Sequence, residues 1–282
     1  MRRFACFVLA ASCMAAPAFA QSATGNPDLP SPESLSNRDT LTLAVGAGVL
    51  PDYVGSNDYR IVPVGAVRGS YKGIAFSSNG SYLQADLIPR AGKVDFDLGP
   101  IVGLRFNGRR HIHDPVVKLL PQTKTAIEVG AFAGISLHGL TNSYDTLALH
   151  VDILHDVSGV HRSTVIGPNV SFSTPLSRRT YASLSVGGEF VSNRFADYYF
   201  SVTPPGSLAS GLPVFDAGGG LKNWKVGLLL NQSITGDLLG GLSIFGTGQY
   251  SRLLGDFKRS PVVSQRGSAS QWLGAVGLAY TW

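Results

Sequence analysis

The feature that most constrains this chain is a series of segments in which large apolar residues alternate with small or polar ones. The last segment, 271–282, is the clearest: every second residue is apolar or Gly, Trp272 and Trp282 mark its two ends, and Leu273 is the exception among small, weakly polar residues. Alternation places the two sets on opposite faces of a β-strand. An apolar face with aromatic ends and a small, weakly polar opposite face are typical of a strand with lipid on one side and a lumen on the other.

Similar segments recur along the chain and predict an all-β, antiparallel transmembrane β-barrel over residues 40–282. The predicted strands lie near 41–50, 60–69, 73–88, 93–107, 126–138, 146–155, 164–175, 180–191, 222–235, 240–252 and 269–282. Bacterial barrels of this kind have an even number of strands. Asn79-Gly80 is a strong hairpin signal that splits 73–88, so we expect about 12 strands, with ten as the alternative.

A soluble β-sandwich also alternates, but its polar face meets bulk water and carries many charged residues. Here only 15% of the residues are charged, 34 are Gly, and the second face is mostly small. Small side chains suit the narrow interior of a barrel. The connections also alternate, because 253–268, 192–221, 156–163 and 108–125 are predicted external loops, whereas 236–239, 176–179, 139–145 and 89–92 are predicted periplasmic turns.

The N-terminus has the features of a cleaved secretory signal. Residues 1–20 combine Arg2 and Arg3, a short apolar run and an Ala18-Phe19-Ala20 cleavage site, and 21–39 form a polar leader that we expect to be flexible. Cleavage removes both cysteines and lowers the formal net charge from +5 to +3. This charge is too small to indicate nucleic-acid binding. No later stretch is long and apolar enough for a transmembrane helix, so we expect a protein of the Gram-negative outer membrane.

Charged residues on the middle strands fall on the predicted lumen face. These lumen candidates are Asp95, Asp97, Arg105, Glu128, His150 and Asp152. His150 and Asp152 share a face, so they either orient a serine nucleophile in a lipid hydrolase or belong to a hydrogen-bond network that offsets the cost of burying polar groups. No Gly-x-Ser-x-Gly element is present, and we predict no catalytic residue.

A second group of titratable residues falls in the predicted external loop 108–125. His111, His113 and Asp114 offer metal-ligand atoms, but Arg109 and Arg110 beside them repel a cation, so we predict neither a metal site nor a cofactor. The basic residues Arg105, Arg109, Arg110, Lys118 and Lys124 either meet the phosphates of outer-membrane lipid and lipopolysaccharide or form a solvated loop.

Several motifs resemble those of the MipA/OmpV family, also called the MltA-interacting protein family. The motifs are Pro51-Asp52-Tyr53-Val54-Gly55-Ser56, Asp58-Tyr59-Arg60, Tyr199-Phe200-Ser201-Val202, Asp216-Ala217-Gly218-Gly219-Gly220 and Tyr250-Ser251-Arg252-Leu253-Leu254-Gly255-Asp256. The chain departs from the family at its end, where Trp282 replaces the more frequent Phe. The resemblance implies an outer-membrane barrel and, from its best-described member, a scaffold that joins a murein lytic transglycosylase to a penicillin-binding synthase.

We therefore expect a non-enzymatic scaffold or interaction protein of the cell envelope, with a narrow channel for small solutes as the alternative. The family-like motifs also supply rim candidates near the predicted point of barrel closure. These rim candidates are Asp52, Tyr53, Asp58, Arg60, Arg252 and Asp256. Their charged members either form an ion-pair network that pins closure or act in gating and ligand contact.

Overall fold

A computed structural model of the protein describes residues 39–89, 92–106 and 112–282. The predicted signal peptide 1–20, and the leader 21–39 except for Asp39, lie outside the described residues. So do Arg109, Arg110 and His111 of the loop after the fifth strand. The described residues therefore cover the predicted barrel region 40–282 except for 90–91 and 107–111.

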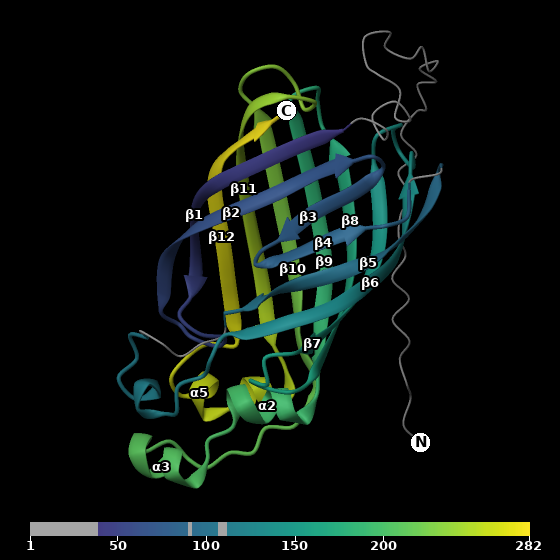
Figure 1. Cartoon of the computed structure of the whole chain (residues 1–282). Coiled ribbons are helices and arrows are strands. Elements are labelled where there is room, and N and C mark those ends of the chain that lie inside the picture. Colours follow the sequence, from purple (N-terminus) through teal and green to yellow (C-terminus); the bar gives the residue numbers. More distant parts are fainter. Residues whose placement is uncertain (1–38, 90–91, 107–111) are drawn as a thin grey trace, which may run out of the picture. The chain divides into compact units, whose positions relative to one another are not determined.

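Twelve antiparallel strands form a closed barrel, which confirms the predicted fold class and the larger strand number (Figure 1). The strands are β1 (Thr40–Pro51), β2 (Tyr59–Tyr71), β3 (Ile74–Asn79), β4 (Tyr82–Asp86), β5 (Val94–Arg105), β6 (Ala126–His138), β7 (Thr146–Asp156), β8 (Thr164–Pro175), β9 (Thr180–Val191), β10 (Gly220–Ser233), β11 (Gly241–Leu253) and β12 (Ser270–Thr281). Each strand pairs with its neighbours in sequence, and β1 pairs with β12. The hairpin split at Asn79-Gly80 is present, with Gly80 at a φ of 59°.

The alternation seen in the sequence separates the two faces of the barrel wall. Val45 pairs with Leu278 on the outer face, where both are exposed, and Gly46 pairs with Gly277 on the inner face. At this closure point a Cβ on Gly46 would lie 2.2 Å from the Val276 carbonyl oxygen, so no larger residue fits. The outer face is an apolar belt of large exposed side chains, as a lipid-facing wall requires.

The two ends of the barrel differ in the length of their connections. The turn end carries the connections 72–73, 87–93, 139–145, 176–179 and 234–240, and the loop end carries 52–58, 80–81, 106–125, 157–163, 192–219 and 254–269. The C-terminus lies at the turn end, and the helices gather at the loop end (Figure 1). The three longest connections, 106–125, 192–219 and 254–269, all lie at the loop end as predicted, whereas 52–58 and 157–163 are no longer than the turns 87–93, 139–145 and 234–240.

The loop end also holds all the helical elements of the described residues. They are η1 (Val117–Leu119), α2 (Asn193–Phe200), α3 (Pro204–Ser210), α4 (Gly255–Arg259) and α5 (Pro261–Ser264). Within the described ranges, no helix has the length and apolar character needed to cross a membrane.

The apolar core lies at the loop end and is built largely from loops. One cluster joins Phe195 and Phe200 of α2 and Phe257 of α4 to apolar residues on the inner ends of the strands. A second cluster joins residues of four loop-end connections, including Tyr53 and Val262. We call the loops 52–58, 112–125, 192–219 and 254–269 the cap, because they pack together over one mouth of the barrel.

Candidate functional site: a capped lumen

Beneath the cap, the barrel interior contains a buried charge cluster centred on Glu128. Its carboxylate accepts hydrogen bonds from Arg105 Nε at 2.7 Å and Tyr82 Oη at 2.6 Å, and His161 Nε2 lies 2.9 Å away. The Glu128 side chain has no exposed surface, and Arg105 and His161 are also buried. Both carboxylate oxygens therefore have polar partners, which a buried charge requires.

A second carboxylate, Glu189 on β9, extends this cluster across the interior. It pairs with the ammonium group of Lys222, lies 3.7 Å from Lys225 Nζ and lies 3.5 Å from Arg105 Nη1. Arg105 thus bridges the two carboxylates. We call the group Tyr82, Arg105, Glu128, His161, Glu189 and Lys222 the charge layer.

Helix α2 of the cap rests on the charge layer. The ring of Phe195 is fully buried, and its centroid lies 5.3 Å from Arg105 Cζ and 5.4 Å from Lys222 Nζ. The His161 ring packs against it at 5.1 Å. Cations within about 6 Å of an aromatic ring are attracted to its face, and more strongly where water is excluded. The cap is therefore attached to the barrel interior and does not merely cover the mouth.

Polar contacts between loops hold the cap together. Asp114 accepts from Arg266 Nη2 at 2.8 Å, which joins loops 112–125 and 254–269. Burial alone would raise the pKa of Asp114, but the backbone N–H of Val117 and the Arg266 guanidinium bring that pKa below its ordinary value. The hydrogen bond to Asp114 also raises the pKa of Arg266. Both residues therefore stay charged at neutral pH.

Away from the cap, toward the turn end, the interior is polar and partly accessible. Asp97 accepts from Ser136 Oγ at 2.6 Å and lies 2.8 Å from His150 Nε2. The His150 side chain is 27% exposed, whereas Glu128 is fully buried. Asp95 pairs with His138 at 2.9 Å. Exposure therefore varies in this half of the interior, because the Asp95 side chain is only 3% exposed.

The structure places the six lumen candidates on the inner face in two groups. Arg105 and Glu128 belong to the charge layer, and Asp95, Asp97, His150 and Asp152 lie nearer the turn end. Ser136 donates its hydroxyl proton to Asp97 and not to His150. This trio therefore lacks the serine-to-histidine hydrogen bond that activates a nucleophile.

The rim candidates on loop 52–58 and β2 do not contact one another through their side chains in any hydrogen bond or ion pair of the described residues. Asp52 is buried and lies 2.6 Å from His113 Nδ1, and Tyr53 donates to the Val262 carbonyl at 3.4 Å. The backbone N–H of Asp58 donates to Ser56 Oγ, and the buried Nε of Arg60 has no hydrogen-bond partner.

The rim candidates near the last loop are also separated. Asp256 pairs with Arg259 and accepts from the Gly218 N–H at 2.9 Å, whereas Arg252 donates to Ser270 Oγ at 3.2 Å. Within the described part of the chain, no ion pair joins two of the six rim candidates. The rim candidates therefore form no single ion-pair network at the closure point. Asp52, Tyr53 and Asp256 make separate contacts within the cap, and Arg252 lies on the outer face of β11.

The residues of loop 108–125 that offer metal-ligand atoms also have separate partners. His113 pairs with Asp52 and Asp114 pairs with Arg266, while His111 lies outside the described residues. Across residues 39–89, 92–106 and 112–282, no group of three His, Cys, Asp or Glu side chains is placed to hold a metal ion.

Sequence reasoning missed four members of the charge layer: Tyr82, His161, Glu189 and Lys222. Lys222 turns inward because the β9–β10 register shifts between Leu221 and Asn223, which no alternation rule reveals. His161 comes from a loop. Phe195 and the rest of the α2 core had a signal, because Phe195, Ala196, Tyr199 and Phe200 follow a helical spacing.

Comparison with known proteins identifies a family and several similar structures. A family model described as MltA-interacting protein MipA matches residues 43–282. Similar solved structures include OmpT of Vibrio cholerae, at 6% identity and a TM-score of 0.36, covering 87% of this chain and 97% of that one. Another is the COG4313 outer membrane channel from Pseudomonas putida F1, at 10% identity and a TM-score of 0.44, covering 90% and 97%. No curated protein matches the sequence.

Proposed function

Because the chain belongs to the MltA-interacting protein MipA family, we propose that this outer-membrane β-barrel is a non-enzymatic scaffold. It binds a murein lytic transglycosylase, and through it the synthesis machinery, at the periplasmic end of the barrel. In barrels of this class the short turns face the periplasm and the long loops face outward. On that rule the cap faces the outside, and the turn end faces the partner.

The observation that carries this proposal is the closed outer mouth. The cap has its own apolar core, and Arg105, Glu128 and His161 beneath it are buried, so the loop end offers solutes no open path through the described residues. A barrel sealed on the outside is suited to work from its inner side. The turns themselves are short, so a partner must contact the rim directly.

The turn end offers a charged surface for such a contact. Lys72, Lys93, Arg178 and Arg179 are all exposed there. Asp145, an acidic residue of the same end, is buried within its own turn. Asp39 is also exposed at this end, and Asp86 and Asp237 are half-buried. Among the described residues the four exposed cations therefore outnumber the exposed acidic residue, and an acidic face on the partner would complement them.

The test is capture of a purified murein lytic transglycosylase by the refolded barrel. We expect the wild type to bind, and the double substitution Arg178→Glu, Arg179→Glu to weaken binding. A matched control is Arg259→Glu, which changes an exposed charge at the loop end. Heat-modifiable gel migration checks that each variant is folded. If this double variant binds as well as the wild type, Arg178 and Arg179 do not take part in binding. No binding by the wild type would contradict the scaffold role.

A channel is the second candidate, because part of the inner face is polar and accessible. Asn169, Ser171, Ser185 and Asn231 point inward and are partly exposed. These residues favour water in the turn-side half of the lumen. For conduction, the cap would have to move, which electrical recording detects directly.

A further inference from the structure

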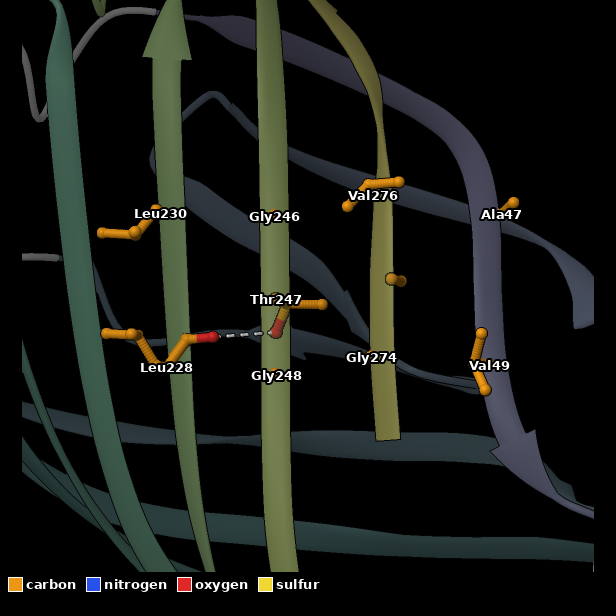
Figure 2. Close-up of a pocket in the computed structure, with 10 residues that line it drawn as sticks. Ala47, Val49, Leu228, Leu230, Gly246, Thr247, Gly248, Gly274 and Val276 are labelled. Atoms are coloured by element: carbon orange, nitrogen blue, oxygen red, sulfur yellow. Dashed lines mark hydrogen bonds between the residues drawn. The ribbon is translucent and has the colours of Figure 1, made fainter. Parts of the chain in front are cut away.

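The outer wall of the barrel carries an apolar groove across β10, β11, β12 and β1 (Figure 2). Its volume is about 410 Å³. Leu228 and Leu230 form one side, Val276 and Val49 form the other, and glycines form the floor between them. A Cβ added at Gly246 or Gly248 would meet nothing within 4 Å, so the missing side chains create the open space.

An aromatic cluster lies on the same outer face, next to the loop-end side of the groove. Tyr250 follows Gly248 by two residues, and its ring packs against Trp224 at 5.3 Å and Trp272 at 4.8 Å. Trp272 lies on the same outer face of β12 as Gly274. Tyr and Trp are enriched at the membrane–water interface, which places this cluster at headgroup level.

Arg252 lies one step beyond the aromatic cluster and has no carboxylate partner among the described residues. Its Nη1 donates to Ser270 Oγ at 3.2 Å, and the residue that pairs with it on β10 is Trp224. Arg252 also interacts with the hydroxyl of Tyr250, but no carboxylate among the described residues neutralises its charge, so the guanidinium can bind an anion. Arg is the side chain best suited to bind phosphate, because its donors form a planar fork.

The separation between Arg252 and the groove fits one lipid molecule. Gly248 precedes Arg252 by four residues, which is about 14 Å along a strand and about 10 Å in depth for a strand tilted by about 40°. Half of a bilayer's hydrocarbon core is about 15 Å thick. A lipid whose phosphate contacts Arg252 would therefore lay an acyl chain along the glycine floor.

We propose that this groove and Arg252 form a binding site for a lipid with a phosphomonoester headgroup in the outer leaflet, such as lipid A. The acyl chain occupies the groove, the aromatic cluster contacts the glycerol or sugar region, and Arg252 binds the phosphate. A second copy of the chain fits less well, because ten residues line the groove, whereas a stable protein interface takes about 20–30 residues a side.

Tryptophan fluorescence offers a direct test, because Trp224 and Trp272 adjoin the proposed site. The barrel is placed in phosphatidylcholine nanodiscs that contain increasing fractions of lipid A or phosphatidic acid with brominated acyl chains, which quench nearby tryptophan. Brominated phosphatidylcholine is the reference for unspecific contact. We expect half-quenching by the phosphomonoester lipids at a mole fraction about fivefold lower than by the reference.

Two variants separate the parts of the site. Arg252→Gln should remove the preference for the phosphomonoester lipids, with Arg194→Gln, at an exposed arginine of α2, as the matched control. Gly248→Leu should fill the groove and reduce quenching by every brominated lipid, with Gly65→Leu as its control on the outer face of β2, where an added Cβ meets only one atom at 3.8 Å. Equal quenching by all lipids in the wild type, or a preference that survives both substitutions, would overturn the proposal.

Discussion

At the scale of single residues, Glu128 explains how a charge is tolerated inside the barrel. Each of its carboxylate oxygens has a polar partner, and Arg105 and His161 share one of them. Removing one member of such a buried set leaves the others without compensation. The charge layer therefore depends on all its members, and the loss of one should cost far more than the loss of a surface pair.

We predict that Glu128→Ala destabilises the barrel by about 3–5 kcal/mol, because Arg105 would stay buried and lose a carboxylate. Glu128→Gln should cost less, since the amide retains an acceptor. Equilibrium unfolding in urea with lipid vesicles measures both changes. A cost below about 1 kcal/mol for the alanine variant, typical of an exposed pair, would show that the charge layer contributes little.

Asp145 predicts a pH dependence in the turn 139–145. The hydroxyl of Thr141, together with backbone N–H groups of Thr141, Leu140 and Asn142, lowers the pKa of Asp145 to about 2. A depressed carboxyl pKa stabilises the fold above the ordinary pKa of Asp, and that contribution disappears as the pH falls toward 2. Asp145→Asn should therefore lower the melting temperature at pH 6 and have little effect near pH 2. The same difference at both values would contradict this assignment.

At the scale of secondary-structure elements, α2 is the helix that fills the loop-end mouth of the barrel. It buries Phe195, Ala196, Tyr199 and Phe200 against the barrel interior. Burial raises the pKa of the Tyr199 phenol above its ordinary value. The phenol therefore stays neutral over the physiological range.

We predict that Phe195→Ala loosens α2 while the strands remain intact. Removing a fully buried phenylalanine costs about 3–5 kcal/mol, and the loss falls on the cap because the ring contacts Arg105, Lys222 and His161. Limited proteolysis should cut loop 192–219 about a hundredfold faster. Leu208→Ala is the control, since that side chain is 90% exposed. Equal cleavage rates for the two variants would contradict the anchoring role of Phe195.

Elements differ in how far the sequence predicts them. Residues 126–138, 164–175 and 180–191 alternate so regularly that the predicted strand bounds match the structure. The start of β10 does not, because its register shift at Leu221 and Asn223 reverses the face of Lys222. Contacts such as Asp114 with Arg266 join loops 152 residues apart, and no local pattern encodes them. Lipid-facing strands obey a local rule, whereas the cap depends on packing between distant loops.

At the scale of the whole barrel, the two ends have opposite character. The loop end is closed by the cap, with buried aromatic and charged residues in contact, and the turn end keeps partly exposed polar residues and several exposed cations. The apolar belt and the long connections at one end follow from sequence, so the barrel and its localisation were predictable. Closure of one mouth was not, because it requires the positions of α2 and α4 over the interior.

Single-channel recording of the refolded protein in a planar bilayer tests the central claim most directly, since that claim is a barrel sealed at its outer end. We predict no discrete conductance steps from the wild type, with folding verified by heat-modifiable migration of the same sample. Deletion of α2 (Asn193–Phe200) serves as the positive control and should produce steps, because it removes the helix that rests on the charge layer. Steady, discrete steps from the wild type would contradict the sealed barrel and favour the channel.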